Sequence, residues 1–142
     1  MAALTIKEAE PSDAVFLADL VDQLGYPAAP GEIRRRMEQL GRDVQTTLVA
    51  ELDGGPAGVA VIQISPVLLE NAPTCRLAVL VVADPARRQG IGRALVLAVE
   101  EEARRSGCNW IVLESGVWRD KAHNFYRSLG YESVALGFSK EF

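Results

Sequence analysis

A glycine-rich turn at residues 87–93, Arg87-Arg88-Gln89-Gly90-Ile91-Gly92-Arg93, combines residue types that bind phosphate. It follows an apolar run and begins an amphipathic stretch, so backbone N–H groups and the positive end of a helix would converge there. Glycine lets the backbone approach an anion closely, and Arg88 and Arg93 can add charge-assisted hydrogen bonds. The turn therefore predicts a pyrophosphate site, and the alternative is an ordinary strand-to-helix connection.

Two common nucleotide motifs do not fit this turn. A dinucleotide fingerprint needs a third glycine where this chain has Leu95. The P-loop pattern, with its lysine followed by serine or threonine, is absent from the sequence. Both classes of nucleotide-binding protein are therefore disfavoured.

Composition narrows the class of protein further. A chain of 142 residues with 49% hydrophobic residues can form one core, and we expect a single domain over residues 1–142. The formal net charge of -4 argues against a nucleic-acid partner, and no apolar run is long enough to span a membrane. Two cysteines and one histidine argue against a disulfide framework and a metal site. Together these features predict a cytoplasmic protein.

Hydrophobic periodicity predicts the elements that position the turn. We expect strands over residues 4–8, 46–52, 57–64, 77–82 and 110–113, with one or two more over 131–142. We expect helices over residues 12–25, 33–40, 90–107 and 122–129. The segments 77–82 and 110–113 are apolar throughout, which is typical of strands buried on both faces, and Asp53-Gly54-Gly55-Pro56 predicts a hairpin turn. The order indicates an α+β fold with a mixed sheet.

Two motifs in this order resemble a known family. The pattern Arg87-x-x-Gly90-x-Gly92 is similar to the acetyl-CoA motif of the GCN5-related N-acetyltransferase (GNAT) superfamily, and residues 122–131 resemble its second signature, A-x-x-x-Y-x-x-x-G-[FY]. The resemblance implies an acyl-CoA N-acyltransferase fold. In that fold a mixed, mostly antiparallel sheet is flanked by helices, and two strands splay apart at the cofactor site.

The resemblance also implies where acetyl-CoA binds. The strand before the turn would offer its backbone to the pantetheine arm, and the turn would hold the pyrophosphate. The residues concerned are Leu80, Val81 and Val82, then Arg87, Arg88, Gln89, Gly90, Ile91, Gly92 and Arg93. Many relatives have asparagine seven residues before the motif tyrosine, whereas this chain has Arg119. Arg119 is a candidate to contact a cofactor phosphate or an anionic group of the substrate.

The catalytic candidates come from the second motif and its surroundings. Tyr126 matches the family's tyrosine beside the thioester sulfur, where a phenol can protonate the departing thiolate, and the alternative is a packing role. Glu114 matches the position of the base in ribosomal-protein N-terminal acetyltransferases, and the alternative is an ordinary polar residue at a strand end. Weaker candidates for the base are Glu51, Asp53 and Glu70. His123 is interpreted as a surface or cofactor-flanking residue.

The resemblance predicts an acetyl-CoA-dependent N-acetyltransferase in which a primary amine attacks acetyl-CoA directly in a ternary complex, without a metal. Residues 115–123 are similar to a subgroup containing aminoglycoside and aminoalkylphosphonate acetyltransferases, so a small-molecule amine is favoured. The alternatives are a protein N-terminal or lysine acetyltransferase and a non-catalytic acetyl-CoA-binding module. The sequence is also compatible with a homodimer. The acceptor would be selected by residues 26–41, residues 65–74 and the terminal strands.

Overall fold

The computed structural model describes residues 3–87 and 89–142, so the predicted contribution of Arg88 lies outside the described residues. The chain divides into two compact units, Met1–Val112 and Leu113–Phe142. The expectation of a single domain over residues 1–142 stays a prediction.

The described residues form a five-stranded sheet with the order β1-β2-β3-β4-β5. Its strands are β1 (Leu4–Glu8), β2 (Thr46–Leu52), β3 (Gly55–Ser65), β4 (Thr74–Val82) and β5 (Ile111–Leu113). The pairs β1–β2, β2–β3 and β3–β4 are antiparallel. Sequence-adjacent strands thus lie side by side. Short connections join β2 to β3 and β3 to β4, whereas helices lie in the connections from β1 to β2 and from β4 to β5.

The predicted hairpin between β2 and β3 is confirmed, with its register set by the turn. Leu52 faces Gly55, so Asp53 and Gly54 form a two-residue connection. Both have positive φ, 53° for Asp53 and 82° for Gly54, which is the geometry that matches the twist of the flanking strands. This local conformation explains why an Asp-Gly pair stands there.

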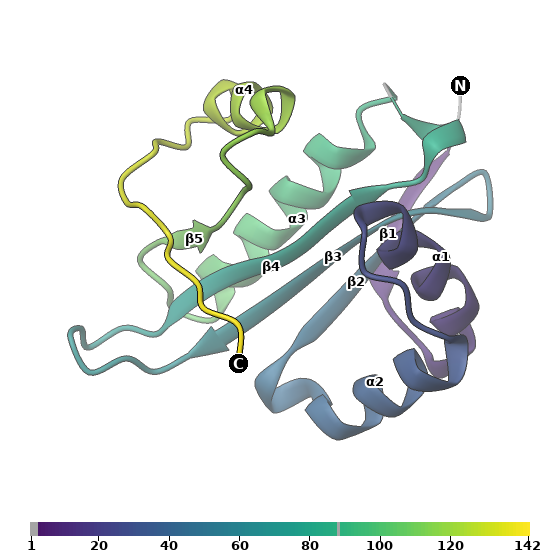
Figure 1. Ribbon diagram of the computed structural model, residues 1–142, viewed down its shortest axis with the longest axis horizontal. Helices are drawn as coiled ribbons and strands as arrows, with labels where there is room; N and C mark the ends of the chain where they lie inside the picture. Colours follow the sequence, from purple (N-terminus) through teal and green to yellow (C-terminus); the bar gives the residue numbers. More distant parts are fainter. Residues whose placement is uncertain (1–2, 88) are drawn as a thin grey trace. The chain divides into compact units, whose positions relative to one another are not determined.

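Helices cover both faces of the sheet in the first unit (Figure 1). The helices are α1 (Ala14–Leu24), α2 (Pro30–Val44) and α3 (Ile91–Arg105). Leu20 of α1 is fully buried in a cluster with Val49 and Val59 of the central strands. On the opposite face, a Cβ placed on Gly58 would lie 3.1 Å from a methyl carbon of Leu95, so α3 packs directly against the β3 backbone. Alternating strand side chains thus fill two helix interfaces.

A β-bulge interrupts β4 at Ala78. Val61 of β3 faces Val79, but the next residue of β3, Ile62, faces Leu77. Ala78 is therefore the extra residue of β4, and a bulge of this kind switches the direction of the backbone groups on its two sides. The bulge lies in the strand that leads to the glycine-rich turn.

The expectation that residues 77–82 are buried on both faces is wrong. Leu77 and Val81 are buried, whereas Ala78 is exposed and the other three residues are half-buried. The helices α1 and α2 cover one face at Val81 and leave the amino-terminal end of β4 open. Residues 110–113 are not fully buried either, since Trp110 is 59% exposed and β5 is half-buried.

The second unit contains α4 (Asp120–Ser128), which confirms the helix predicted over residues 122–129. Gly130 follows it with a φ of 93°, as expected of a glycine that ends a helix. The terminal strands expected over residues 131–142 are not present, because that segment has no regular structure. Its alternating apolar residues Val134 and Leu136 are exposed. The alternation of apolar residues that predicted a strand is therefore present, but the segment pairs with no other strand.

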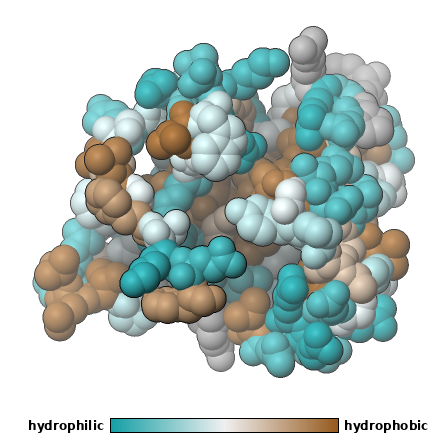
Figure 2. Space-filling model, viewed as in Figure 1, coloured by the Kyte–Doolittle hydropathy of each residue, from teal (hydrophilic) through white to brown (hydrophobic). Residues whose placement is uncertain are grey.

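Hydrophobic surface also occurs in the first unit. Figure 2 shows it at the left of the view, over the loop between β3 and β4. Leu68 and Leu69 of that loop are 100% and 91% exposed. The loop belongs to residues 65–74, one of the segments that we expect to select the acceptor.

Candidate active site

The glycine-rich turn leads from β4 into the amino-terminal end of α3. Gly90 is the residue that caps α3, with a φ of 78° and a ψ of 11°. No side chain caps this helix end, and its first turn has no acidic residue. The first amides of a helix have no partner within the helix, and its dipole favours an anion there. A Cβ on Gly90 would meet nothing within 4 Å, so the turn is also open. These features fit a phosphate group.

Arg87 is held by the protein's own backbone. Its Nε donates a hydrogen bond to the carbonyl oxygen of Val82 at 3.1 Å, and its guanidinium pairs with Asp84. The side chain thereby ties the end of β4 to the start of the turn. Arg93 and Gln89 are exposed nearby in the sequence, on the first turn of α3 and just before it.

The backbone groups of β4 alternate between its two edges. Ala83 donates its N–H to Ala57 of β3 at 2.8 Å, so Ala83 and, two residues before it, Val81 are directed at β3. Leu80 and Val82 are then directed at the other edge, which agrees with the bond from Arg87 to the Val82 carbonyl. Before the Ala78 bulge, Cys75 donates its N–H to Trp110 at 3.4 Å. Backbone groups of Leu80 and Val82 are thus directed away from β3, and those of Val81 are not.

Tyr126 lies on α4 in the second unit, in a small aromatic group. Its ring makes edge-to-face contacts with Phe125, at a centroid separation of 5.3 Å, and with Tyr131, at 5.9 Å. Burial raises the pKa of the Tyr126 phenol, and the positive charge of Arg119 opposes this shift. The phenol is therefore protonated at neutral pH and can act as a proton donor.

His123 makes a contact that sequence reasoning missed. Its Nε2 lies 2.8 Å from the carbonyl oxygen of Gly116, seven residues earlier in the chain. The sequence interpretation of His123 as a surface or cofactor-flanking residue stays a prediction, and its ring is half-buried against the turn before α4. No sequence signal identifies such a bond, because its acceptor is a backbone carbonyl.

The carboxylates proposed as bases differ in what occupies them. Glu51 pairs with Lys7 at 3.2 Å, and Asp53 accepts the N–H of Ala3 at 2.8 Å, so both have structural partners. Among the residues that the structure describes, Glu70 Oε2 is buried without a hydrogen-bond partner. Glu114 is exposed immediately after β5. These structural partners weaken Glu51 and Asp53 as candidates for the base.

The two cysteines are poorly suited to form thiolates. Cys75 is fully buried, and burial raises the pKa of its thiol to about 11. Burial also raises the pKa of the Cys108 thiol. Because the thiolate is the nucleophile, both side chains are weakly reactive at neutral pH.

Two further observations concern residues 3–87 and 89–142. They contain no group of three or more histidine, cysteine, aspartate or glutamate side chains that could hold a metal ion. Within the same residues, no helix combines the length and the apolar character needed to cross a membrane.

A pocket of about 120 Å³ lies in the first unit, between the ends of α2 and β1 and the start of β2. Its lining residues are Glu8, Ala9, Met37, Leu40, Gly41, Gln45, Thr46 and Thr47. Ligand pockets usually enclose about 300–1,000 Å³, so this one is too small for an oligosaccharide-sized acceptor.

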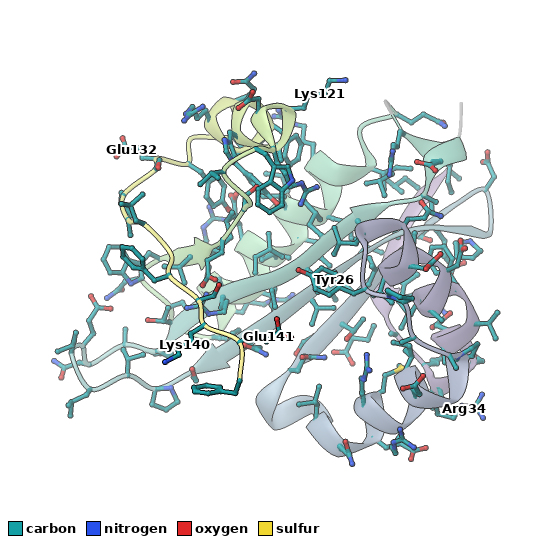
Figure 3. The ribbon with its side chains drawn as sticks, in the orientation of Figure 1. Tyr26, Arg34, Lys121, Glu132, Lys140 and Glu141 are labelled. Atoms are coloured by element: carbon teal, nitrogen blue, oxygen red, sulfur yellow. The ribbon has the colours of Figure 1, made fainter. Side chains whose placement is uncertain are left out.

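Tyr26 is labelled in Figure 3 on the loop between α1 and α2, where it is 71% exposed.

Comparison with known proteins identifies the class of enzyme to which this fold and these motifs belong. The profile of the Acetyltransferase (GNAT) family matches residues 15–131. The chain belongs to this family and is an acetyl-CoA-dependent N-acetyltransferase.

Three individual relatives resemble parts or all of the chain at 25–41% sequence identity. The chain is 41% identical over 61 residues to the aminoalkylphosphonate N-acetyltransferase of Salmonella typhimurium, covering 43% of this chain and 40% of that enzyme. It is 29% identical over 137 residues to the aminoglycoside N(6′)-acetyltransferase type 1 of Stenotrophomonas maltophilia, covering 93% of this chain and 88% of that enzyme. A GNAT family acetyltransferase of Staphylococcus aureus has the same fold, with a TM-score of 0.83 and 25% identity over 99% of each chain.

Proposed function

We propose that this enzyme transfers the acetyl group of acetyl-CoA to the primary amine of a small molecule, by direct attack in a ternary complex. The observation that carries the proposal is the family match over residues 15–131, which includes the half-buried Tyr126 of the second motif. A non-catalytic binding module has no need of a proton donor in the second motif. The names of the two relatives described above support a small amine as the acceptor.

The cofactor would be held mainly by residues of the first unit. The open, uncapped end of α3 at Gly90 suits the pyrophosphate, and Arg93 adds positive charge. Leu80 and Val82 suit the pantetheine amides, because their backbone groups are directed away from β3. Val81 is directed at β3, which argues against the backbone role that we expected for it. Arg119 is the proposed contact for a further phosphate.

Proton transfer would be divided between two residues. A lysine-type amine has a pKa of about 10.4 and is largely protonated at neutral pH, so a base is needed before it can attack. Glu114 is the proposed base. Acetyl-CoA supplies the acetyl thioester, and the proposed role of Tyr126 is to donate a proton to the departing sulfur.

Direct attack is supported by the state of the cysteines. An acyl-enzyme mechanism would need a reactive thiolate, whereas Cys75 is fully buried with a pKa of about 11. The pKa of Cys108 is raised as well. Neither residue belongs to the two motifs.

The acceptor would be selected by the loops around the first unit. Tyr26 is exposed on one of them, and Glu70 on another has a buried oxygen without a partner. A carboxylate in that state can stabilise a cationic amine by a charge-assisted hydrogen bond. Glu70 is therefore a candidate for acceptor binding, beside its weaker candidacy as a base.

The test is release of CoA measured across a panel of aminoglycosides, aminoalkylphosphonates, peptides with free amino termini and lysine peptides. We expect saturable turnover with a small-molecule amine. Preference for a peptide would instead support a protein acetyltransferase. Tight binding of acetyl-CoA without turnover of any amine would support a non-catalytic module. The cytoplasmic location and the possible homodimer stay predictions.

A further inference from the structure

The turn before α4 is closed by one carbonyl oxygen that accepts two hydrogen bonds. Gly116 O accepts the backbone N–H of Arg119 at 3.0 Å and lies 2.8 Å from His123 Nε2. The backbone N–H of His123 in turn donates to the carbonyl oxygen of Arg119 at 3.0 Å. A carbonyl oxygen has two lone pairs, so both acceptor positions of Gly116 are used. Gly116, Arg119 and His123 thus form a closed ring of hydrogen bonds.

The chemistry of the contact fixes the state of the histidine. A carbonyl oxygen can only accept, so Nε2 of His123 carries the proton in this bond. The ring is half-buried, which protects the bond from competition with water. The Trp118 indole packs against the same turn, since a Cβ on Gly116 would lie 2.7 Å from its ring. The backbone path of residues 116–119 is therefore constrained from two sides.

The residue that this turn directs is Arg119. It caps the amino-terminal end of α4, and its side chain is exposed. Its charge acts on Tyr126, one helical turn beyond His123. The position of the Arg119 backbone sets the centre of the region that its long side chain can reach, and a fixed backbone limits that region. Without the bond from His123, only the single bond from the Arg119 N–H would close the turn.

We propose that His123 is a positioning residue that fixes, through the Gly116 carbonyl, the direction in which Arg119 is presented to a phosphate of acetyl-CoA. The inference rests on the proposed function in one respect, namely that Arg119 contacts the cofactor. His123 itself contacts no reacting atom in this scheme. It differs from a residue that only stabilises the fold, because its effect depends on the phosphates of the substrate.

The experiment compares His123→Leu with His123→Gln, whose side-chain amide can restore a donor near the Nε2 position. The control is Asn124→Leu, which introduces leucine at the neighbouring exposed position of α4. Two acetyl donors are used, acetyl-CoA and S-acetyl-pantetheine, which lacks all phosphates of CoA. For His123→Leu we expect kcat/KM with acetyl-CoA to fall by about tenfold, the scale of one lost hydrogen bond to a positioned group. The value with S-acetyl-pantetheine should stay unchanged, and His123→Gln should recover most of the loss.

A double variant separates this inference from the proposed function. If His123 acts through Arg119, His123→Leu should cause no further loss in an Arg119→Ala background. An additive loss in the double variant would overturn the positioning role. Equal losses with both acetyl donors, together with a lower Tm, would assign His123 to general stability. An Arg119→Ala variant with normal acetyl-CoA kinetics would instead overturn the proposed cofactor contact of Arg119.

Discussion

Arg87 Nε donates a hydrogen bond to the carbonyl oxygen of Val82 at 3.1 Å, across the turn that joins β4 to α3. This bond occupies the carbonyl of one of the two residues whose backbone groups are directed away from β3. In the proposed cofactor site, pantetheine would therefore pair with the N–H of Val82 and with the backbone of Leu80. The arginine that begins the acetyl-CoA motif thus shapes the end of the strand, beside any contact of its own with phosphate.

The turn at Gly90 tests the cofactor site. We expect Gly90→Glu to abolish acetyl-CoA binding, because it places a negative charge where the pyrophosphate would lie. The φ of 78° also strains glutamate and most other residues with a Cβ, at a cost of about 1–3 kcal/mol. Gly90→Asn is the matched control, since asparagine tolerates this conformation and adds no charge. Calorimetry with acetyl-CoA is the measurement, and equal affinities for the two variants would refute the site.

Tyr126→Phe separates chemistry from packing. The variant retains the ring contacts with Phe125 and Tyr131 and removes only the hydroxyl. We expect kcat to fall by about 10²–10⁴-fold, the usual effect of a positioned general acid, with little change in acetyl-CoA affinity. The lower end is favoured because a thiol of pKa about 8.5 already gives a tolerable leaving group. Tm serves as the folding control, and a kcat close to that of the wild type would assign Tyr126 to packing.

Glu114→Gln and Glu70→Gln distinguish a base from a residue that binds the amine. If Glu114 is the base, its variant should lose turnover by about 10²–10⁴-fold, most strongly at low pH, where most of the amine is protonated. Glu70→Gln should raise KM for the amine and leave kcat nearly unchanged. Rate profiles against pH for both variants provide the measurement. Equal losses at every pH for Glu114→Gln, or a parallel fall in stability, would contradict its role as base.

The cysteines predict a particular dependence of stability on pH. The pKa of Cys75 is about 11 in the folded protein against a reference of 9.0, so folding favours the protonated thiol. Its contribution to stability is present below pH 9 and is lost as the pH rises towards 11. Denaturant unfolding between neutral and alkaline pH should show this loss in the wild type and a weaker one in Cys75→Ala.

The same cysteines test direct attack. A variant carrying both Cys75→Ala and Cys108→Ala should retain turnover, because neither thiol carries an acetyl intermediate in the proposed mechanism. Mass spectrometry of the wild type mixed with acetyl-CoA alone should show no acetylated cysteine. Loss of turnover in a folded double variant would support a cysteine-bound intermediate.

The sequence by itself determined the local elements and the family. The Asp53-Gly54 hairpin, the capping glycine Gly90 and the helix before Gly130 depend on short-range backbone conformation, which neighbouring residues specify. The glycine-rich turn and the Tyr126 motif identified an acetyl-CoA-dependent enzyme for the same reason, since both are contiguous stretches of residues.

Only the tertiary structure decided which polar groups are engaged. Register across β3 and β4 placed the bulge at Ala78 and directed Val81 away from the edge that Leu80 shares with Val82. Alternation along a strand is visible in a sequence, but an inserted residue in the pairing is not, because it depends on the partner strand. The bond between His123 and Gly116 was hidden for a similar reason, since every residue type has the same backbone carbonyl. The terminal strands were predicted wrongly because alternation of apolar residues supplies a face for packing but no partner for the backbone.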